Sequence, residues 1–172
     1  CTYVPMSLIL LSCAVLTGCA GPLPPVPPAP DRAYEQIFPD AFARHVRFLA
    51  DPALGGRAAG SPGNAQAAQY IADQFSMAGL RPGGADDGWF DPFAVRALSD
   101  DRPGRNVIGR LDSPLGAAPT IVIGAHYDHL ATITGPDGNM LVFPGADDNA
   151  SGVAALILVA RALATTPERR CN

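Results

Sequence analysis

Apolar residues recur with helical spacing at the start of the folded part of the chain. Phe42, Val46 and Leu49 are four and three positions apart, so they share one face of a helix. The basic residues Arg44 and Arg47 lie between them and fall on other faces. This pattern predicts an amphipathic helix over residues 40–50.

A second helix is predicted after a loop rich in turn-forming residues, 54–63. Ser61 is a good N-cap, and Pro62 fits the first turn of the helix that follows it. Gly79 ends the helix, and Leu80 can fold back onto its last turn. One apolar face runs along the helix and contains Ala68, Ile71, Ala72, Phe75 and Ala78.

The second half of the chain shows strand patterns and one further helix. Short apolar runs rich in Val and Ile predict strands over 106–111 and 120–125. The second run is almost entirely apolar, as in a central strand buried on both faces. After a loop over 132–148, Asn149 or Ser151 caps a helix that runs to Ala164 and is apolar nearly all round. Helices, strands and then a helix predict an α/β fold with a mixed, partly parallel sheet flanked by helices.

The N-terminal end predicts an exported and anchored protein. Residues 7–18 are apolar but fall short of the roughly 20 residues that span a bilayer, which fits a signal peptide. The segment ends in Leu-Thr-Gly-Cys19, which resembles the lipobox of bacterial lipoproteins. We therefore expect residues 1–19 to be a signal peptide and Cys19 to carry lipid. A buried apolar helix is the alternative, because no Arg or Lys precedes Cys19.

A proline-rich linker follows over residues 20–38, with six prolines between Gly21 and Pro30. Such a segment stays extended and serves as a spacer. Together with the lipobox it predicts a domain outside the cytoplasm, in the cell envelope, that is held to a membrane by an N-terminal lipid.

Composition excludes some classes of protein. The 172 residues fit one domain, and 48% of them are hydrophobic, enough for a core. The net charge of -4 argues against a nucleic-acid partner. No cysteine lies between Cys19 and Cys171, so we expect neither a disulfide nor a thiolate metal site in the body of the domain.

Two polar motifs carry candidate chemistry. His126-Tyr127-Asp128-His129 directly follows a predicted strand, and Asp147-Asp148-Asn149 directly precedes the last helix. His126 offers an imidazole nitrogen and Asp147 a carboxylate, and zinc accepts both. Asp128 could accept the other ring N–H of His126 and fix its orientation. Taken singly, each motif is also explained by a structural histidine or by a helix cap.

Five segments, in order, resemble the M28 family of zinc peptidases. They are Leu54–Arg57 with Gly60–Gly63, Ala68–Phe75 with Gly79–Leu80, Arg105–Ile108, His126–His129 and Gly145–Gly152. The resemblance implies a zinc-exopeptidase-like fold, two zinc ions and peptide substrates. It implies that His126 binds one zinc, that Asp147 bridges both and has a cis peptide bond to Asp148, and that Asp128 orients His126.

The resemblance also implies residues that this sequence does not supply. The family has a Glu-Glu pair after the last helix, of which the first is the general base, and a later Asp and His that bind metal. The only Glu after Asp148 is Glu168, which lies alone in a polar segment. We therefore expect residues 39–172 to be the N-terminal part of an aminopeptidase domain, inactive alone. A glutaminyl cyclase-like acyltransferase and a non-catalytic relative remain alternatives.

Overall fold

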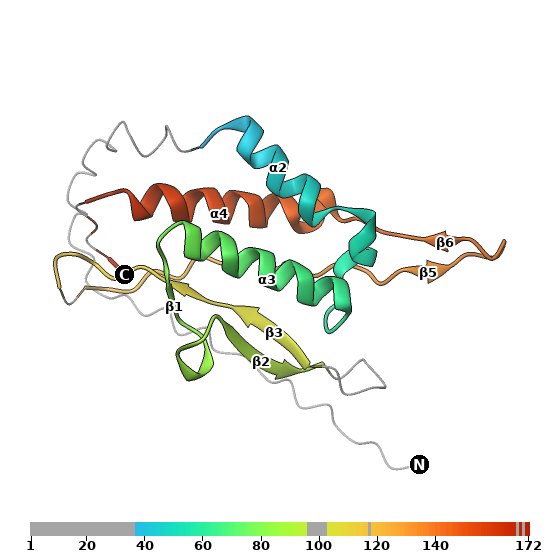
Figure 1. Cartoon of the computed structure of the whole chain (residues 1–172), viewed down its shortest axis with the longest axis horizontal. Helices are drawn as coiled ribbons and strands as arrows, with labels where there is room; N and C mark the ends of the chain where they lie inside the picture. Colours follow the sequence, from blue (N-terminus) through green and yellow to red (C-terminus); the bar gives the residue numbers. More distant parts are fainter. Residues whose placement is uncertain (1–36, 96–102, 117, 168, 170) are drawn as a thin grey trace, which may run out of the picture.

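Three helices and six short strands form the described part of the chain. A computed structural model describes residues 37–95, 103–116, 118–167, 169 and 171–172. The helices are α2 (Pro39–Leu49), α3 (Pro62–Met77) and α4 (Ser151–Ala164), and they lie together as one layer (Figure 1). The predicted signal peptide, Cys19 and most of the linker lie outside the described residues.

The helices form where the sequence predicts them, and for the expected reasons. Ser61 Oγ accepts a hydrogen bond from the Asn64 backbone N–H at 3.1 Å, so α3 has its predicted cap. At its other end Gly79 has φ +85°, and the Leu80 N–H donates to the Phe75 carbonyl at 3.0 Å. This is the hydrogen-bonding pattern of a glycine-terminated helix.

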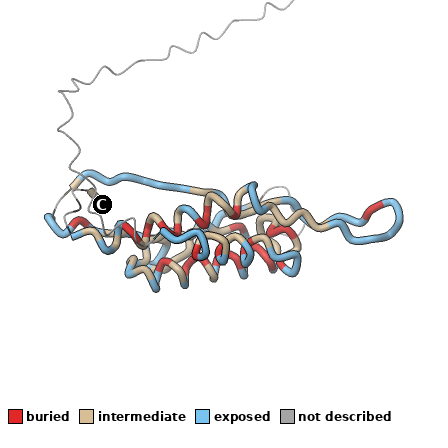
Figure 2. The backbone as a smooth tube through the Cα atoms, turned by 90° about the horizontal axis from the view of Figure 1, so that it is seen from above, coloured by how far each residue is buried: buried red, intermediate tan, exposed pale blue. Residues whose placement is uncertain are grey.

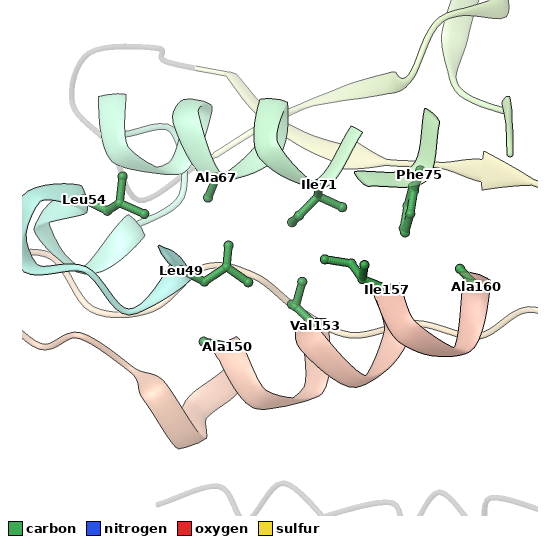
Figure 3. Packing of buried hydrophobic residues seen from close by; sticks show 9 residues of the cluster. All are labelled: Leu49, Leu54, Ala67, Ile71, Phe75, Ala150, Val153, Ile157 and Ala160. Atoms are coloured by element: carbon green, nitrogen blue, oxygen red, sulfur yellow. The ribbon is translucent and has the colours of Figure 1, made fainter. Parts of the chain in front are cut away.

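The core lies between α3 and α4, and α2 covers one end of it. Side chains from these helices point toward one another in Figure 3. Leu49 and Ile157 are fully buried, and Val153 is nearly so. Burial of one such side chain contributes about 1.5–3 kcal/mol to the free energy of unfolding. Because several side chains of α4 are buried in this cluster, their packing fixes where the helix begins. The prediction that α4 is buried holds for one side of the helix: six of its fourteen residues are buried, whereas Ala155 and Leu163 are exposed.

The strands pair in twos, and every pair among the described residues is antiparallel. β1 (Arg81–Pro82) pairs with β4 (Gly109–Arg110), and β2 (Phe90–Ala94) pairs with β3 (Pro103–Val107). A 3₁₀ turn, η2 (Ala85–Asp87), separates β1 from β2. The mixture of helices and strands confirms the α/β class, whereas the described strands contain none of the expected parallel pairing.

The strand predicted over 120–125 is wrong for the described structure. This segment belongs to no sheet, although the Ile121 N–H donates a hydrogen bond to the Asn172 carbonyl at 3.0 Å. Its apolar side chains are open to solvent, and Val122 is 89% exposed. The reason is that a buried strand needs neighbours on both sides, and no described strand lies beside this one.

A hairpin interrupts the predicted loop over 132–148. β5 (Ile133–Thr134) pairs with β6 (Met140–Leu141), and the two project away from the helices (Figures 1 and 2). The turn is closed by a 3.0 Å hydrogen bond from the Gly138 N–H to the Gly135 carbonyl. The run Gly-Pro-Asp-Gly over 135–138 is a turn signal that could have predicted this hairpin.

None of the helices in the described ranges is both long and apolar enough to cross a membrane.

His45 occupies a buried position between α2 and α3, so of the structural and surface roles that its place in the first helix allows, it has the structural one. Its Nδ1 lies 2.7 Å from the Tyr70 hydroxyl, and Tyr70 in turn stacks on Phe48. Burial lowers the pKa of His45 below its ordinary value of 6.5, and the charges of Arg161 and Arg44 lower it further. The folded protein therefore favours neutral His45.

This preference predicts a loss of stability in acid. The unfolded chain binds a proton at His45 near pH 6.5 and the folded protein only at lower pH, so this contribution is complete above 6.5 and is lost as the pH falls toward the lowered pKa. Urea denaturation between about pH 7.5 and about pH 5 should show this loss. His45→Gln, whose amide can still contact Tyr70, should show a smaller one. Equal pH dependence in both proteins would contradict the assignment to His45.

Candidate metal centre

The two polar motifs meet at the N-terminal end of α4. The second motif forms one turn of π-helix, η3 (Ala146–Ala150), immediately before α4. Asn149 joins it to the first motif, because its Nδ2 donates to the His126 carbonyl at 3.3 Å. Its Oδ1 accepts from the Gly152 N–H at 3.2 Å. One side chain therefore holds His126 against the start of the helix.

His126 faces a carboxylate on each side of its ring. Its Nε2 lies 3.1 Å from Asp148 Oδ1, and its Nδ1 lies 3.5 Å from Asp128 Oδ1. All three side chains are about half exposed or more. The hydrogen-bond acceptor at Nδ1 is the Asp128 backbone carbonyl, at 3.2 Å, while Nε2 is directed at a second acidic group. The orienting role of the Asp128 carboxylate stays a prediction. An imidazole nitrogen and a carboxylate oxygen this close are a typical pair of ligands for a divalent metal.

The acidic partner of His126 is Asp148 and not the predicted Asp147. The backbone is non-helical at Asp148, with φ -111° and ψ 90°, and this turns the Asp148 carboxylate toward His126. The cis peptide bond expected between Asp147 and Asp148 lies instead between Asp148 and Asn149. The metal-binding role of Asp147 stays a prediction. Two adjacent aspartates cannot be told apart by residue type, so only the backbone conformation distinguishes them.

His129 approaches the same carboxylate from the other side. Its Nδ1 lies 2.9 Å from the Phe143 carbonyl oxygen, which can only accept, so Nδ1 carries a proton. Its Nε2 then lies 3.7 Å from Asp148 Oδ2, and the side chain is only 16% exposed. Sequence reasoning did not place His129 among the metal ligands, and the structure brings it to the edge of the site.

The loop from His126 to His129 rests on a close backbone approach at Gly56, within the 3₁₀ segment η1 (Pro52–Arg57). Gly56 has φ +79°, and a Cβ atom there would overlap the Leu130 carbonyl oxygen. Gly145 plays the same part for the second motif, because a Cβ atom there would overlap the ring of His129. These glycines let the loops lie within contact distance of each other.

Tyr127 fastens the same loop to β3. Its hydroxyl donates to the Arg105 carbonyl, and the side chain is partly buried against the core. Burial raises the pKa of Tyr127 to about 12, so the hydroxyl stays protonated and remains a donor at physiological pH.

The donors that are present fit one side of a zinc site. His126 and Asp148 supply two converging ligands of types that zinc accepts, whereas a catalytic zinc commonly takes three protein ligands and a water. Within the ranges that the structure describes, no three His, Cys, Asp or Glu side chains are close enough together to hold a metal ion.

A comparison with known protein families finds a match in the second half of the chain. Residues 106–171 match peptidase family M28. The matched segment contains His126, Asp128 and Asp148, together with all of α4. This part of the chain is therefore similar to a family of peptidases, which is the family that the sequence motifs resemble.

Curated relatives extend the similarity to most of the chain. The chain is 31% identical to the Escherichia coli alkaline phosphatase isozyme conversion protein over 138 residues, which cover 76% of the chain and 38% of that protein. It is 32% identical to the uncharacterized protein YfbL of Escherichia coli over 129 residues, covering 73% and 34%. A shorter segment of 52 residues is 48% identical to nicalin of Caenorhabditis elegans and covers 30% of this chain and 8% of that protein. No solved structure matches the chain.

The close backbone approach at Gly56 predicts the relative stability of two glycine-to-alanine variants. Gly56→Ala should destabilise the fold more than Gly79→Ala, because both residues have positive φ but only Gly56 lies against another backbone. The left-handed conformation alone costs an alanine about 1–2 kcal/mol, and the overlap at Gly56 adds about 1–3 kcal/mol. Urea denaturation of the two variants measures the difference. Equal losses of stability would show that the loop yields freely at Leu130.

Proposed function

We propose that this chain supplies one side of the metal centre of a zinc-dependent aminopeptidase of the M28 type. The observation that carries the proposal is the 3.1 Å approach of His126 Nε2 to the Asp148 carboxylate within the region that matches the peptidase family. The family implies peptide substrates. Hydrolysis at the N-terminal residue and dependence on zinc are the finer parts of the proposal.

The side chains divide the work in the following way. His126 and Asp148 would hold zinc, which would polarise a peptide carbonyl and lower the pKa of a bound water. The Asp128 backbone carbonyl accepts a hydrogen bond from His126 Nδ1 at 3.2 Å, and the Asp128 carboxylate lies 3.5 Å from the same nitrogen. Nε2 of neutral His126 would then be unprotonated and directed at the metal position. Asn149 keeps His126 and Asp148 together, because it bonds both the His126 carbonyl and the first turn of α4.

The chain covers less than two fifths of each Escherichia coli relative, so the activity of a whole protein is itself a proposal. We propose that the general base and the remaining zinc ligands come from residues beyond these 172. The 172-residue chain alone should then bind zinc weakly and should not hydrolyse peptides.

The test begins with the gene. Sequencing past the codon for Asn172 should show an apolar strand that ends in a Glu-Glu pair, with an Asp and a His further on. The full-length product should then hydrolyse aminoacyl-p-nitroanilides with two zinc ions bound. Asp148→Asn should lower both zinc affinity and kcat/KM by more than about 100-fold, because loss of a ligand exceeds the 10–100-fold effect of an outer partner.

Asp147→Asn is the matched control for that experiment, since it removes the neighbouring carboxylate and leaves the contact with His126. It should keep zinc and activity. Loss in Asp147→Asn with retention in Asp148→Asn would favour the assignment made from sequence. Pyroglutamate formation with a single bound zinc would favour the glutaminyl cyclase alternative. Zinc binding without any catalysis would favour the non-catalytic relative.

We also propose that the mature protein is anchored to a membrane of the cell envelope through lipid on Cys19. The support is the Leu-Thr-Gly-Cys sequence and the proline-rich linker, both in the part of the chain outside the described residues. Radiolabelled fatty acid fed to expressing cells should label the protein, and Cys19→Ala should lose the label. Cys13→Ala, in the same apolar segment, should keep it. An unlabelled wild-type protein would contradict the anchor.

A further inference from the structure

Arg57 is the most deeply buried charged residue in the described part of the chain, with 1% of its surface exposed. Its guanidinium is enclosed by backbone carbonyls. Nε donates to Tyr127 O at 2.9 Å, Nη2 to Gly145 O at 3.0 Å, and Nη1 to Pro144 O at 2.5 Å and also to Leu49 O. A buried cation is tolerated only where its donors are satisfied, and here the backbone satisfies them.

The four carbonyls come from three segments that are distant in sequence. Leu49 ends α2, Tyr127 is next to His126, and Pro144 and Gly145 lie three to four residues before Asp148. The backbone of Arg57 takes part as well, because its carbonyl accepts from the His129 N–H at 3.4 Å. One residue thus contacts the backbone of both loops that carry the candidate ligands.

The backbone conformation of Arg57 shows that its surroundings constrain this residue closely. Its φ is +63°, in the left-handed region that favours glycine. Burial lowers its pKa, while the charges of Asp128 and Asp148 oppose that shift. In the described ranges no carboxylate lies within ion-pair distance of the guanidinium, so the carbonyls satisfy its donors and the site carboxylates act on it from further away.

Only arginine can make this set of bonds. Its guanidinium presents five N–H donors in a planar fork, whereas a lysine ammonium presents three around a single point. A lysine at position 57 would keep the positive charge but could not bond the Tyr127 carbonyl and the Pro144–Gly145 carbonyls together. The substitution Arg57→Lys therefore tests the hydrogen-bonding geometry of this side chain separately from its positive charge.

We propose that Arg57 is a positioning residue for the metal centre, whose guanidinium holds the loop of His126 and the loop of Asp148 at the spacing that lets both bind one metal ion. The identity of the metal in this proposal rests on the proposed function, whereas the alignment of the two loops by Arg57 does not.

The experiment compares wild type, Arg57→Lys and Phe75→Leu in the full-length product of the gene. Phe75 is buried in α3 and takes part in none of the hydrogen bonds of the Arg57 guanidinium, so Phe75→Leu controls for a general loss of stability. Hydrogen exchange is measured over residues 124–130, 143–150 and α3, and zinc affinity by competition with a chelator. Arg57→Lys should exchange faster in both loops but not in α3, and its zinc Kd should rise by about 10–100-fold.

The outcomes separate the two proposals. Wild-type exchange and affinity in Arg57→Lys would overturn the positioning role, and so would an equal loss of zinc affinity in Phe75→Leu of similar melting temperature. Absence of zinc binding in wild type would overturn the proposed function, while loop exchange would still decide the role of Arg57.

A measurement on wild type covers the case in which Arg57→Lys does not fold. The Nη protons of Arg57 should exchange slowly in nitrogen-15 NMR spectra, and their signals should shift when zinc is added. Fast exchange of these protons, or signals that ignore zinc, would overturn the proposal.

Discussion

The burial of one cation constrains this structure more than any other interaction. A guanidinium out of water is unfavourable unless each donor finds an acceptor, and the acceptors of Arg57 belong to the end of α2 and to the two polar loops. These segments can satisfy Arg57 only when they lie together. The glycine before it has no side chain, which permits the close approach to Leu130 on which that arrangement depends. The Gly-Gly-Arg run and the His126 loop are therefore parts of one construction, although 70 residues separate Arg57 from Tyr127.

The hydrophobic core supplies the other half of the arrangement. Val153 and Ile157 pack α4 against α3, which fixes the first turn of α4 in space, and Asn149 and Asp148 immediately precede that turn. Core packing thus places the second motif from one side, and Arg57 places it from the other. The candidate ligands themselves remain half exposed. The site is therefore held at its backbone and open at its side chains, which is the arrangement that the proposed binding of a metal and a substrate requires.

Local patterns were enough to predict the helices but not the sheet. Helical spacing, the Ser61 cap and the Gly79 stop each act within a few residues, so α2, α3 and α4 could be read from the sequence. Whether residues 120–125 form a strand could not be read in this way. An apolar run favours burial but does not indicate which strand will lie beside it. The hairpin of β5 and β6 was not predicted for a different reason: each strand has only two residues, too few to show an alternating pattern beside the Gly-Pro-Asp-Gly turn.

In the candidate site, too, some features could be predicted from local sequence patterns and others could not. Residue types and their order indicated that the two polar motifs would meet through His126 and Asp147, whereas the carboxylate beside His126 belongs to Asp148. The choice between Asp147 and Asp148 depended on a non-helical turn in the backbone, which leaves no trace in composition or periodicity. The segment Leu54–Arg57 was noted for its resemblance to the family, but the contacts of Arg57 could not be predicted, since its partners are carbonyl oxygens that every residue possesses. Sequence motifs therefore name the atoms that can perform chemistry, whereas the backbone that aligns those atoms is determined by contacts between distant segments, and those contacts become apparent only in the folded chain.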